Sequence, residues 1–269
     1  LFDCHPLNPG YSTLGLNEVR ITMPDGKEEW LWKDQKLGFS LKDNRKRFLA
    51  HTDVLRVSNL ISTTTSFLAD NLAECVERPK DEFVILPNSV DFNVFKPFSR
   101  QARDHKKIRI GWTASDSHLV EGRMVANIIS EMCKRRDDFQ FVILGNIEKF
   151  RVVAQQMNIE WHSFTELFAY PLKLASLEFD IGICPLEDHS FNLCKSALKW
   201  SEYAAMGIPS VCSKLAPYSV IRRGQDGMLA TTPFDFADKI CELMDNPALR
   251  QNIADNAYAR NFEEYNMDK

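Results

Sequence analysis

The feature that most constrains the fold is an alternation of short apolar runs with longer amphipathic stretches, which begins at residue 83. The apolar runs have the length and composition of buried strands. They are FVILP (83–87), IRIGW (108–112), FQFVILG (139–145), IEWHS (159–163), DIGICPL (180–186), PSVCS (209–213) and GMLA (227–230). Helical periodicity occupies the intervals, at 120–135, 148–157, 166–177, 195–206, 234–244 and 247–265. This alternation predicts an α/β protein with a Rossmann-like parallel sheet and helices on both faces.

The residues before this alternating region follow a different pattern. They are rich in turn residues and contain a basic run at 45–47, which we interpret as a solvated helix face. Near residue 60 a strand is predicted to lead into a helix, with Ser62 or Thr63 as the N-cap. We therefore predict three segments: a partial N-terminal segment with a crossover at 1–75, a sheet domain at 76–246, and a C-terminal helix at 247–269 that returns toward the N-terminal side.

The composition excludes several classes of function. The chain has 33 basic and 37 acidic side chains, and its net charge of −4 gives no bulk attraction for nucleic acid. Seven scattered cysteines without a C-x-x-C pair predict neither a disulfide framework nor a metal site. No apolar run is long enough to span a membrane, and the opening residues do not resemble a signal peptide. We therefore expect a cytoplasmic protein with no transmembrane segment.

The segment 180–227 carries the clearest chemical pattern. Helical periodicity over 195–206 predicts a helix that begins near Cys194 or Lys195. Its first free N–H groups, its dipole and the Ser196 hydroxyl would then converge on one anion site. Lys195, Lys199 and Glu202 would share one helical stripe, with cations for phosphates and a carboxylate for ribose hydroxyls. This arrangement suits a nucleoside diphosphate. A surface ion pair between Lys199 and Glu202 is the alternative interpretation.

Other candidate residues directly follow predicted strands, because parallel sheets of this kind bind ligands beyond the carboxyl ends of their strands. Ser115 and His118 follow the strand at 108–112. The imidazole of His118 could donate a hydrogen bond to phosphate, or this residue could be a capping or surface histidine. Gly145 ends the next strand, and Ser163 and Phe164 lie at the end of the one after it.

Several motifs resemble one known family. The string SALKWSEYAAMGIPSV (196–211) resembles the donor-site helix of family 4 retaining glycosyltransferases, in the branch with a K-S-x-L-K-x-x-E-Y-A-A-x-G-x-P pattern. ISTTTSFLADNL and LPNSVDFNVFKP (86–97) resemble the domain-crossing segment of these enzymes. IGWTASDSH (110–118) and GICPLEDHSFN (182–192) resemble parts of their donor domain. The resemblance covers roughly residues 57–265 and implies the C-terminal half of a GT-B fold, with a short N-terminal remnant of the acceptor domain.

This resemblance implies a function. The chain would transfer a hexosyl group from a UDP- or GDP-sugar to a glycan, lipid or protein hydroxyl, with retained anomeric configuration and no cofactor or metal. Lys195, Asn192 and His118 would be catalytic. The donor would be bound by Ser196, Lys199, Glu202, Ser115, Gly145, Ser163 and Phe164. The missing acceptor domain, or a partner chain, would complete the active site.

The sequence departs from the family pattern at two places. Cys194 stands where many members have a second glutamate, and the loop after the strand at 108–112 offers Ser115, Ser117 and His118 in place of an arginine and a lysine. These departures keep two alternatives open. One is a non-catalytic nucleotide-sugar-binding or scaffold domain, and the other is a sugar-nucleotide epimerase of the same fold.

Overall fold

The computed structural model describes residues 17–22, 26–36, 39–95, 98, 107–114, 118–145 and 159–268. The chain divides into two compact units. Unit 1 consists of Leu1–Pro87 and Asp188–Ser196, and unit 2 of Asn88–Glu187 and Ala197–Lys269. The boundary predicted at 75/76 falls at the end of a helix within unit 1, whereas the two units divide after Pro87.

Unit 2 is built on a six-stranded sheet with the order β10-β9-β8-β5-β6-β7, in which every neighbouring pair is parallel. Its strands are β5 (Ile108–Ala114), β6 (Phe139–Gly145), β7 (Glu160–His162), β8 (Ile181–Cys184), β9 (Ser210–Ser213) and β10 (Met228–Ala230). All six coincide with predicted apolar runs. The predicted Rossmann-like parallel sheet is therefore confirmed.

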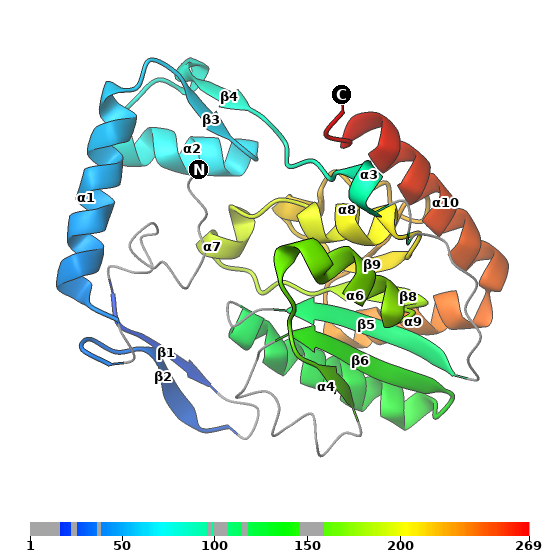
Figure 1. Ribbon diagram of the computed structural model, residues 1–269. Coiled ribbons are helices and arrows are strands. Elements are labelled where there is room, and N and C mark those ends of the chain that lie inside the picture. Colours follow the sequence, from blue (N-terminus) through cyan, green and yellow to red (C-terminus); the bar gives the residue numbers. More distant parts are fainter. Residues whose placement is uncertain are drawn as a thin grey trace. The chain divides into compact units, whose positions relative to one another are not determined.

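Helices cover both faces of this sheet (Figure 1). The helices of unit 2 are α3 (Phe92–Phe95), α4 (Leu119–Arg135), α6 (Tyr170–Ser176), α8 (Leu198–Ala205), α9 (Pro233–Asp245) and α10 (Pro247–Glu264), with short 3-10 turns at Leu167–Ala169 and Ala216–Tyr218. Side chains of α4 and α9 pack on one face, and those of α3, α6 and α8 on the other. The predicted helix at 148–157 lies outside the described residues.

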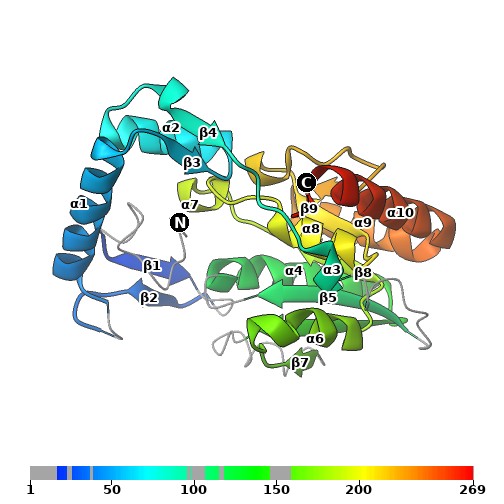
Figure 2. The same cartoon turned by 45° about the horizontal axis from the view of Figure 1, so that its top comes forward.

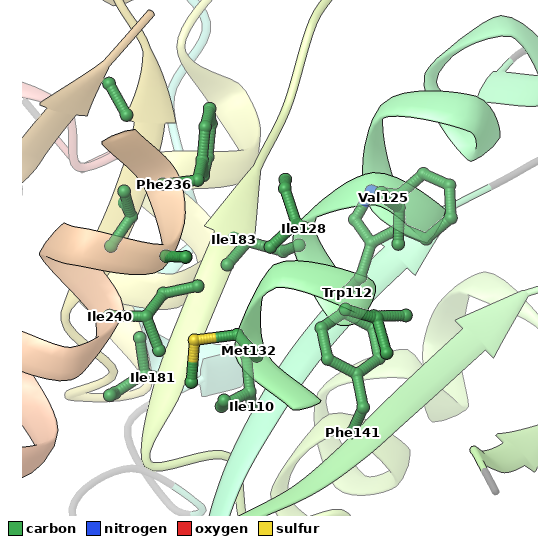
Figure 3. Packing of buried hydrophobic residues seen from close by; sticks show 14 of the residues in the cluster. Ile110, Trp112, Val125, Ile128, Met132, Phe141, Ile181, Ile183, Phe236 and Ile240 are labelled. Carbon is green, nitrogen blue, oxygen red and sulfur yellow. The ribbon is translucent and has the colours of Figure 1, made fainter. Parts of the chain in front are cut away.

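The core beneath α4 and α9 is continuous from strand to helix (Figure 3). Ile110 and Trp112 of β5 meet Ile128 and Met132 of α4, and all four side chains are fully buried. Phe236 of α9 packs into the same cluster. This uninterrupted burial explains why the strands read as apolar runs without alternation.

The described residues of unit 1 form two small sheets. Strands β1 (Val19–Thr22) and β2 (Glu28–Trp32) form an antiparallel pair, and β3 (Ile61–Thr63) pairs with β4 (Phe83–Ile85) in parallel. Its helices are α1 (Leu41–Val57), α2 (Ser66–Val76) and α7 (Ser190–Leu193), with a 3-10 turn at Lys80–Glu82 (Figure 2). The predicted strand at 83–87 is therefore β4 in unit 1, not a member of the large sheet.

Two local predictions for unit 1 have different outcomes. The basic run 45–47 lies on α1 with its side chains exposed, as expected. The N-cap of α2 is Thr65, not Ser62 or Thr63, because the latter two residues belong to β3. The Thr65 hydroxyl accepts a hydrogen bond from the Leu68 N–H at 3.2 Å.

The end of α8 is fixed by a glycine. Gly207 has φ +67°, its N–H donates to the Ala204 carbonyl, and the Ile208 N–H donates to the Tyr203 carbonyl. These are the two hydrogen bonds of a Schellman motif, which requires a left-handed residue at this position. This left-handed C-cap at Gly207 turns the chain directly into β9.

The C-terminal helix α10 supports α8 through Asp226 and Trp200. The indole N–H of Trp200 on α8 donates to the Asp226 carbonyl at 2.8 Å. Arg260 of α10 in turn pairs with the Asp226 carboxylate at 2.8 Å, donates to the Val220 carbonyl, and lies 5.7 Å from the Trp200 ring. The guanidinium group therefore links α10, the loop before β10 and α8.

A glycine in β8 allows α8 to lie close to the sheet. A Cβ atom at Gly182 would lie 2.4 Å from the Tyr203 ring, which is far below van der Waals contact. The hydroxyl of Tyr203 also accepts from the Thr113 N–H at 3.0 Å and donates to the Thr113 hydroxyl at 3.2 Å. Tyr203 thus fixes α8 against both β8 and β5.

We predict that Gly182→Ala lowers the free energy of unfolding by about 1–3 kcal/mol, because the new methyl group forces the tyrosine ring outward. Urea denaturation measures this loss. Tyr203→Leu in the same chain should recover part of it, because the smaller side chain leaves room for the methyl group. Strictly additive effects of the two substitutions would contradict the packing explanation.

Candidate functional site

The strand order of unit 2 creates a natural binding position. β5 and β8 are neighbours, but the strands that follow them lie on opposite sides, with β6 beyond β5 and β9 beyond β8. The connections therefore separate at the carboxyl ends of β5 and β8, which is where open parallel sheets bind ligands. His118 at the start of α4 and Glu187 after β8 stand at this edge. Ser115 lies outside the described residues.

The helix that carries the predicted anion site begins later than expected. α8 starts at Leu198 with Ala197 as its N-cap, so the predicted start at Cys194 or Lys195 is wrong. The short helix α7 occupies the preceding residues, and the Lys195 N–H closes a turn onto the Asn192 carbonyl at 3.1 Å. Lys195 therefore does not share a helical stripe with Lys199 and Glu202.

The capping pattern of α7 explains this interruption. His189 is the N-cap, and its Nδ1 accepts a hydrogen bond from the Asn192 N–H at 3.3 Å. A separate start signal at His189 allows a helix to form and end before α8 begins. The apolar periodicity continues across the break, which is why the sequence alone suggested a single helix.

Asn192, Lys195 and Ser196 consequently belong to unit 1. Asn192 is fully buried within α7, and the Lys195 ammonium group lies 4.8 Å from the centre of the Phe191 ring. The Thr65 hydroxyl at the start of α2 donates to the carbonyl of Cys194 at 3.4 Å. The backbone of Cys194 is thus held by α2.

Lys199 is the central cation of the unit 2 cluster. Its Nζ lies 3.4 Å from His118 Nε2, and His118 Nδ1 lies 3.6 Å from Glu121 Oε2. Burial lowers the pKa of Lys199, while the charges of Glu121 and Glu202 act in the opposite direction. A buried ammonium group with this environment favours an anionic ligand, because a further negative charge nearby stabilises its charged form.

Glu202 lies one turn further along α8. Its Oε2 accepts a hydrogen bond from the Tyr170 hydroxyl at 3.1 Å. Burial raises the pKa of Glu202 to about 7, although the Tyr170 hydrogen bond and the Lys199 charge both lower it. A carboxyl group held in this way can accept hydrogen bonds from ligand hydroxyls through Oε1. The Lys199 and Glu202 side chains are both partly buried, so a surface ion pair does not describe them.

The remaining candidates lie along the same edge of the sheet. Gly145 ends β6, and a Cβ atom there would lie 1.7 Å from the Ala114 carbonyl oxygen, so this position requires glycine for close packing of the two strand ends. Ser163 and Phe164 follow β7 and are exposed. The Phe164 ring stacks on Tyr170 with centroids 6.0 Å apart. It connects the end of β7 with the residue that holds Glu202.

Two residues of this cluster were missed in the sequence. Glu121 is 1% exposed, and it lies on the same stripe of α4 as the core residues Val125, Ile128 and Met132. A carboxylate on an apolar stripe is a signal that could have identified it. Tyr170 stands at the start of α6 and gives no comparable signal, because an aromatic residue at that position is typical of a core.

Residues 117–246 match the sequence model of the family described as Glycosyl transferases group 1. The search of curated proteins found no match. Among solved structures, a glycosyltransferase from Rickettsia africae is similar with a TM-score of 0.65 at 12% identity, covering 83% of this chain and 64% of that structure. The Anabaena protein HepE in complex with UDP and glucose has a TM-score of 0.64 at 12% identity, covering 82% of this chain and 63% of that structure.

A structure of an isolated C-terminal domain is similar over almost its whole length. The C-terminal domain of LpcC, a glycosyl transferase group 1 family protein from Francisella tularensis, has a TM-score of 0.52 at 19% identity and covers 66% of this chain and 99% of that domain. The chain thus has the α/β fold of a GT-B C-terminal Rossmann-like domain. It spans less than two thirds of the length of the Rickettsia and Anabaena proteins.

No helix among the described residues is long and apolar enough to cross a membrane. Within the same residues, no group of three or more His, Cys, Asp and Glu side chains is arranged to hold a metal ion.

The raised pKa of Glu202 predicts a pH-dependent cost to stability. The folded protein holds this proton up to about pH 7, and the unfolded chain only up to about pH 4.5, so the free energy of unfolding falls as pH rises between these values. At pH 8 we expect Glu202→Gln to be about 1–3 kcal/mol more stable than the wild type, with the difference shrinking toward pH 5. Urea denaturation at both pH values measures it.

Glu263→Gln on the exposed surface of α10 is the matched control and should show no such trend. A Glu202→Gln effect that is the same at pH 5 and pH 8 would mean that the carboxyl group titrates normally.

Proposed function

We propose that this protein transfers a hexosyl group from a nucleoside-diphosphate sugar to an acceptor hydroxyl, with retention of anomeric configuration. The observation that carries this proposal is the placement of Lys199 and Glu202 on one helix at the topological switch point of the sheet. They are three residues apart, so they lie on the same side of α8. A cation followed by a hydroxyl-binding carboxylate matches the order of phosphate and ribose in a nucleotide.

The comparisons support the same class of ligand. The family match over residues 117–246 includes His118, Lys199 and Glu202. One similar structure, HepE, was solved with UDP and glucose. We extend this ligand class to the present chain and assign the diphosphate to Lys199 and the ribose to Glu202. The base would lie near Ser163 and Phe164, and it would be uracil or guanine.

Catalysis in this proposal is electrostatic. As the glycosidic bond to the donor breaks, negative charge gathers on the departing diphosphate, and ammonium groups with preorganised N–H groups stabilise it more in the transition state than in the ground state. Lys199 supplies one such charge. The sequence resemblance implies roles for Lys195 and Ser196 at a diphosphate and for Asn192 at the transferred sugar, and all three residues belong to unit 1. No cofactor or metal is required by this mechanism.

If Lys199 binds the diphosphate and Glu202 binds the ribose, substitutions at these two residues should change the affinities for nucleotide and nucleoside differently. Lys199→Met should weaken UDP or GDP binding about tenfold and leave the affinity for the free nucleoside unchanged, because only the phosphates contact the ammonium group. Glu202→Gln should weaken both the nucleotide and the nucleoside. Calorimetry measures these affinities, with Lys239→Met on α9 as a control that should bind like the wild type.

If Lys199→Met reduced nucleoside and nucleotide affinity equally, the phosphate assignment would be wrong. If no nucleoside diphosphate or nucleotide sugar bound to the wild type in a thermal-shift screen, the whole donor site would be refuted.

The catalytic half is tested on the longest natural form of the protein, incubated with the nucleotide sugar that binds best and a panel of hydroxyl acceptors. NMR of the product should show the anomeric configuration of the donor. Inversion would exclude the retaining mechanism. Tight donor binding with neither transfer nor hydrolysis would instead favour a non-catalytic binding domain, the alternative that Cys194 keeps open. An epimerised donor would identify an epimerase.

A further inference from the structure

A buried glutamate, a histidine and a lysine form a chain at the edge of the sheet where α4 and α8 begin. Glu121 and His118 belong to the start of α4, and Lys199 is the second residue of α8. These helices pack on opposite faces of the sheet, so the chain joins the two helical layers. Glu121 is nearly inaccessible at 1% exposure, in the first turn of its helix, where the dipole stabilises a carboxylate.

The two neighbours of His118 determine which of its ring nitrogens carries the proton. A lysine ammonium group has only donors, so the His118 nitrogen that faces it, Nε2 at 3.4 Å, must present a lone pair. A neutral imidazole then carries its proton on Nδ1. That nitrogen is the one that faces Glu121 Oε2, at 3.6 Å. The carboxylate and the ammonium group therefore favour the same tautomer.

We propose that Glu121 and His118 are positioning residues for Lys199: Glu121 selects the Nδ1–H tautomer of His118, and His118 Nε2 then orients the Lys199 ammonium group toward the diphosphate of the donor. His118 thus acts through Lys199 and does not itself donate to phosphate. The last step rests on the proposed donor site, whereas the tautomer and the orientation of Lys199 do not.

Orientation matters because lysine carries its charge on a long, flexible stem. An ammonium group fixed before the ligand arrives loses less conformational freedom on binding, which strengthens its contact with phosphate. Lys199 lies beside His118 and interacts electrostatically with Cys184, Glu121, Glu202 and Cys212. Glu187 after β8 interacts electrostatically with Glu121 and with Arg123 of α4.

A second histidine in unit 2 gives an internal reference with the opposite geometry. His162 Nε2 lies 2.7 Å from Glu160 Oε1, and its Nδ1 lies 3.2 Å from Lys173 Nζ. The same reasoning assigns the Nε2–H tautomer to His162, whose carboxylate partner is also held by Arg109 at 2.8 Å. The two histidines should therefore differ in the same spectrum.

The first test needs no ligand. In the ¹⁵N-histidine-labelled protein, long-range correlations between ring nitrogens and carbon-bound protons distinguish the two neutral tautomers, and His118→Gln assigns the His118 signal by its loss. We expect Nδ1–H for His118 and Nε2–H for His162. Glu121→Gln should alter the His118 pattern and leave that of His162 unchanged. An Nε2–H tautomer for His118, or a pattern insensitive to Glu121→Gln, would overturn the proposal.

The second test measures the consequence for binding. His118→Phe keeps a ring but removes both nitrogens, and it should weaken UDP or GDP binding about tenfold while nucleoside affinity stays unchanged. His118→Gln should restore most of the loss, because its amide oxygen can accept from Lys199. His51→Phe on α1 is the matched control and should bind like the wild type.

Equal loss of nucleoside and nucleotide affinity in His118→Phe would show a merely structural role. Full affinity in His118→Phe would show that Lys199 needs no support. If the wild type bound no nucleotide, the proposed function would fail, and the histidine spectrum alone would decide whether Glu121 and His118 orient Lys199.

Discussion

The pairing of β5 with β8 is the contact on which the rest of unit 2 depends. Where the strands are in register, Gly111 lies opposite Gly182, and the absent side chains leave room for the rings of Phe179 and Tyr203, which pack edge to face. Tyr203 brings α8 onto the sheet, and the reversal of strand order brings the start of α4 to the same edge. One strand pair thus determines both the packing of the core and the place where charged side chains meet.

The charged cluster at this edge combines groups that are costly to bury. Burial disfavours the charged forms of both Lys199 and Glu202. Each group has a polar partner, His118 beside the ammonium group and Tyr170 beside the carboxyl group. Side chains with perturbed pKa values at a sheet edge are typical of functional sites, because folding alone gains little from them. The rigid packing of Tyr203 and Trp200 on α8 holds this arrangement in place.

The sequence predicted the sheet well because buried parallel strands appear as apolar runs. The sequence could not show that β4 pairs with β3 instead of joining the large sheet, because the apolar character of a strand does not specify its partner. It also merged α7 with α8, since periodicity persists across the turn at Lys195. Lys199 and Glu202 were found by their spacing, whereas Tyr170 joined them only through the tertiary fold.

The support of α8 by Arg260 has a practical meaning for work with this chain. The Trp200 indole is anchored on Asp226, which Arg260 of the last helix holds in turn. The Val90 N–H and carbonyl pair with Tyr265 and Met267, which follow that helix. Removing the residues from Arg260 onward would therefore loosen α8, which carries Lys199 and Glu202. A truncation within α10 would thus weaken the support of α8 and of the charged residues that α8 carries.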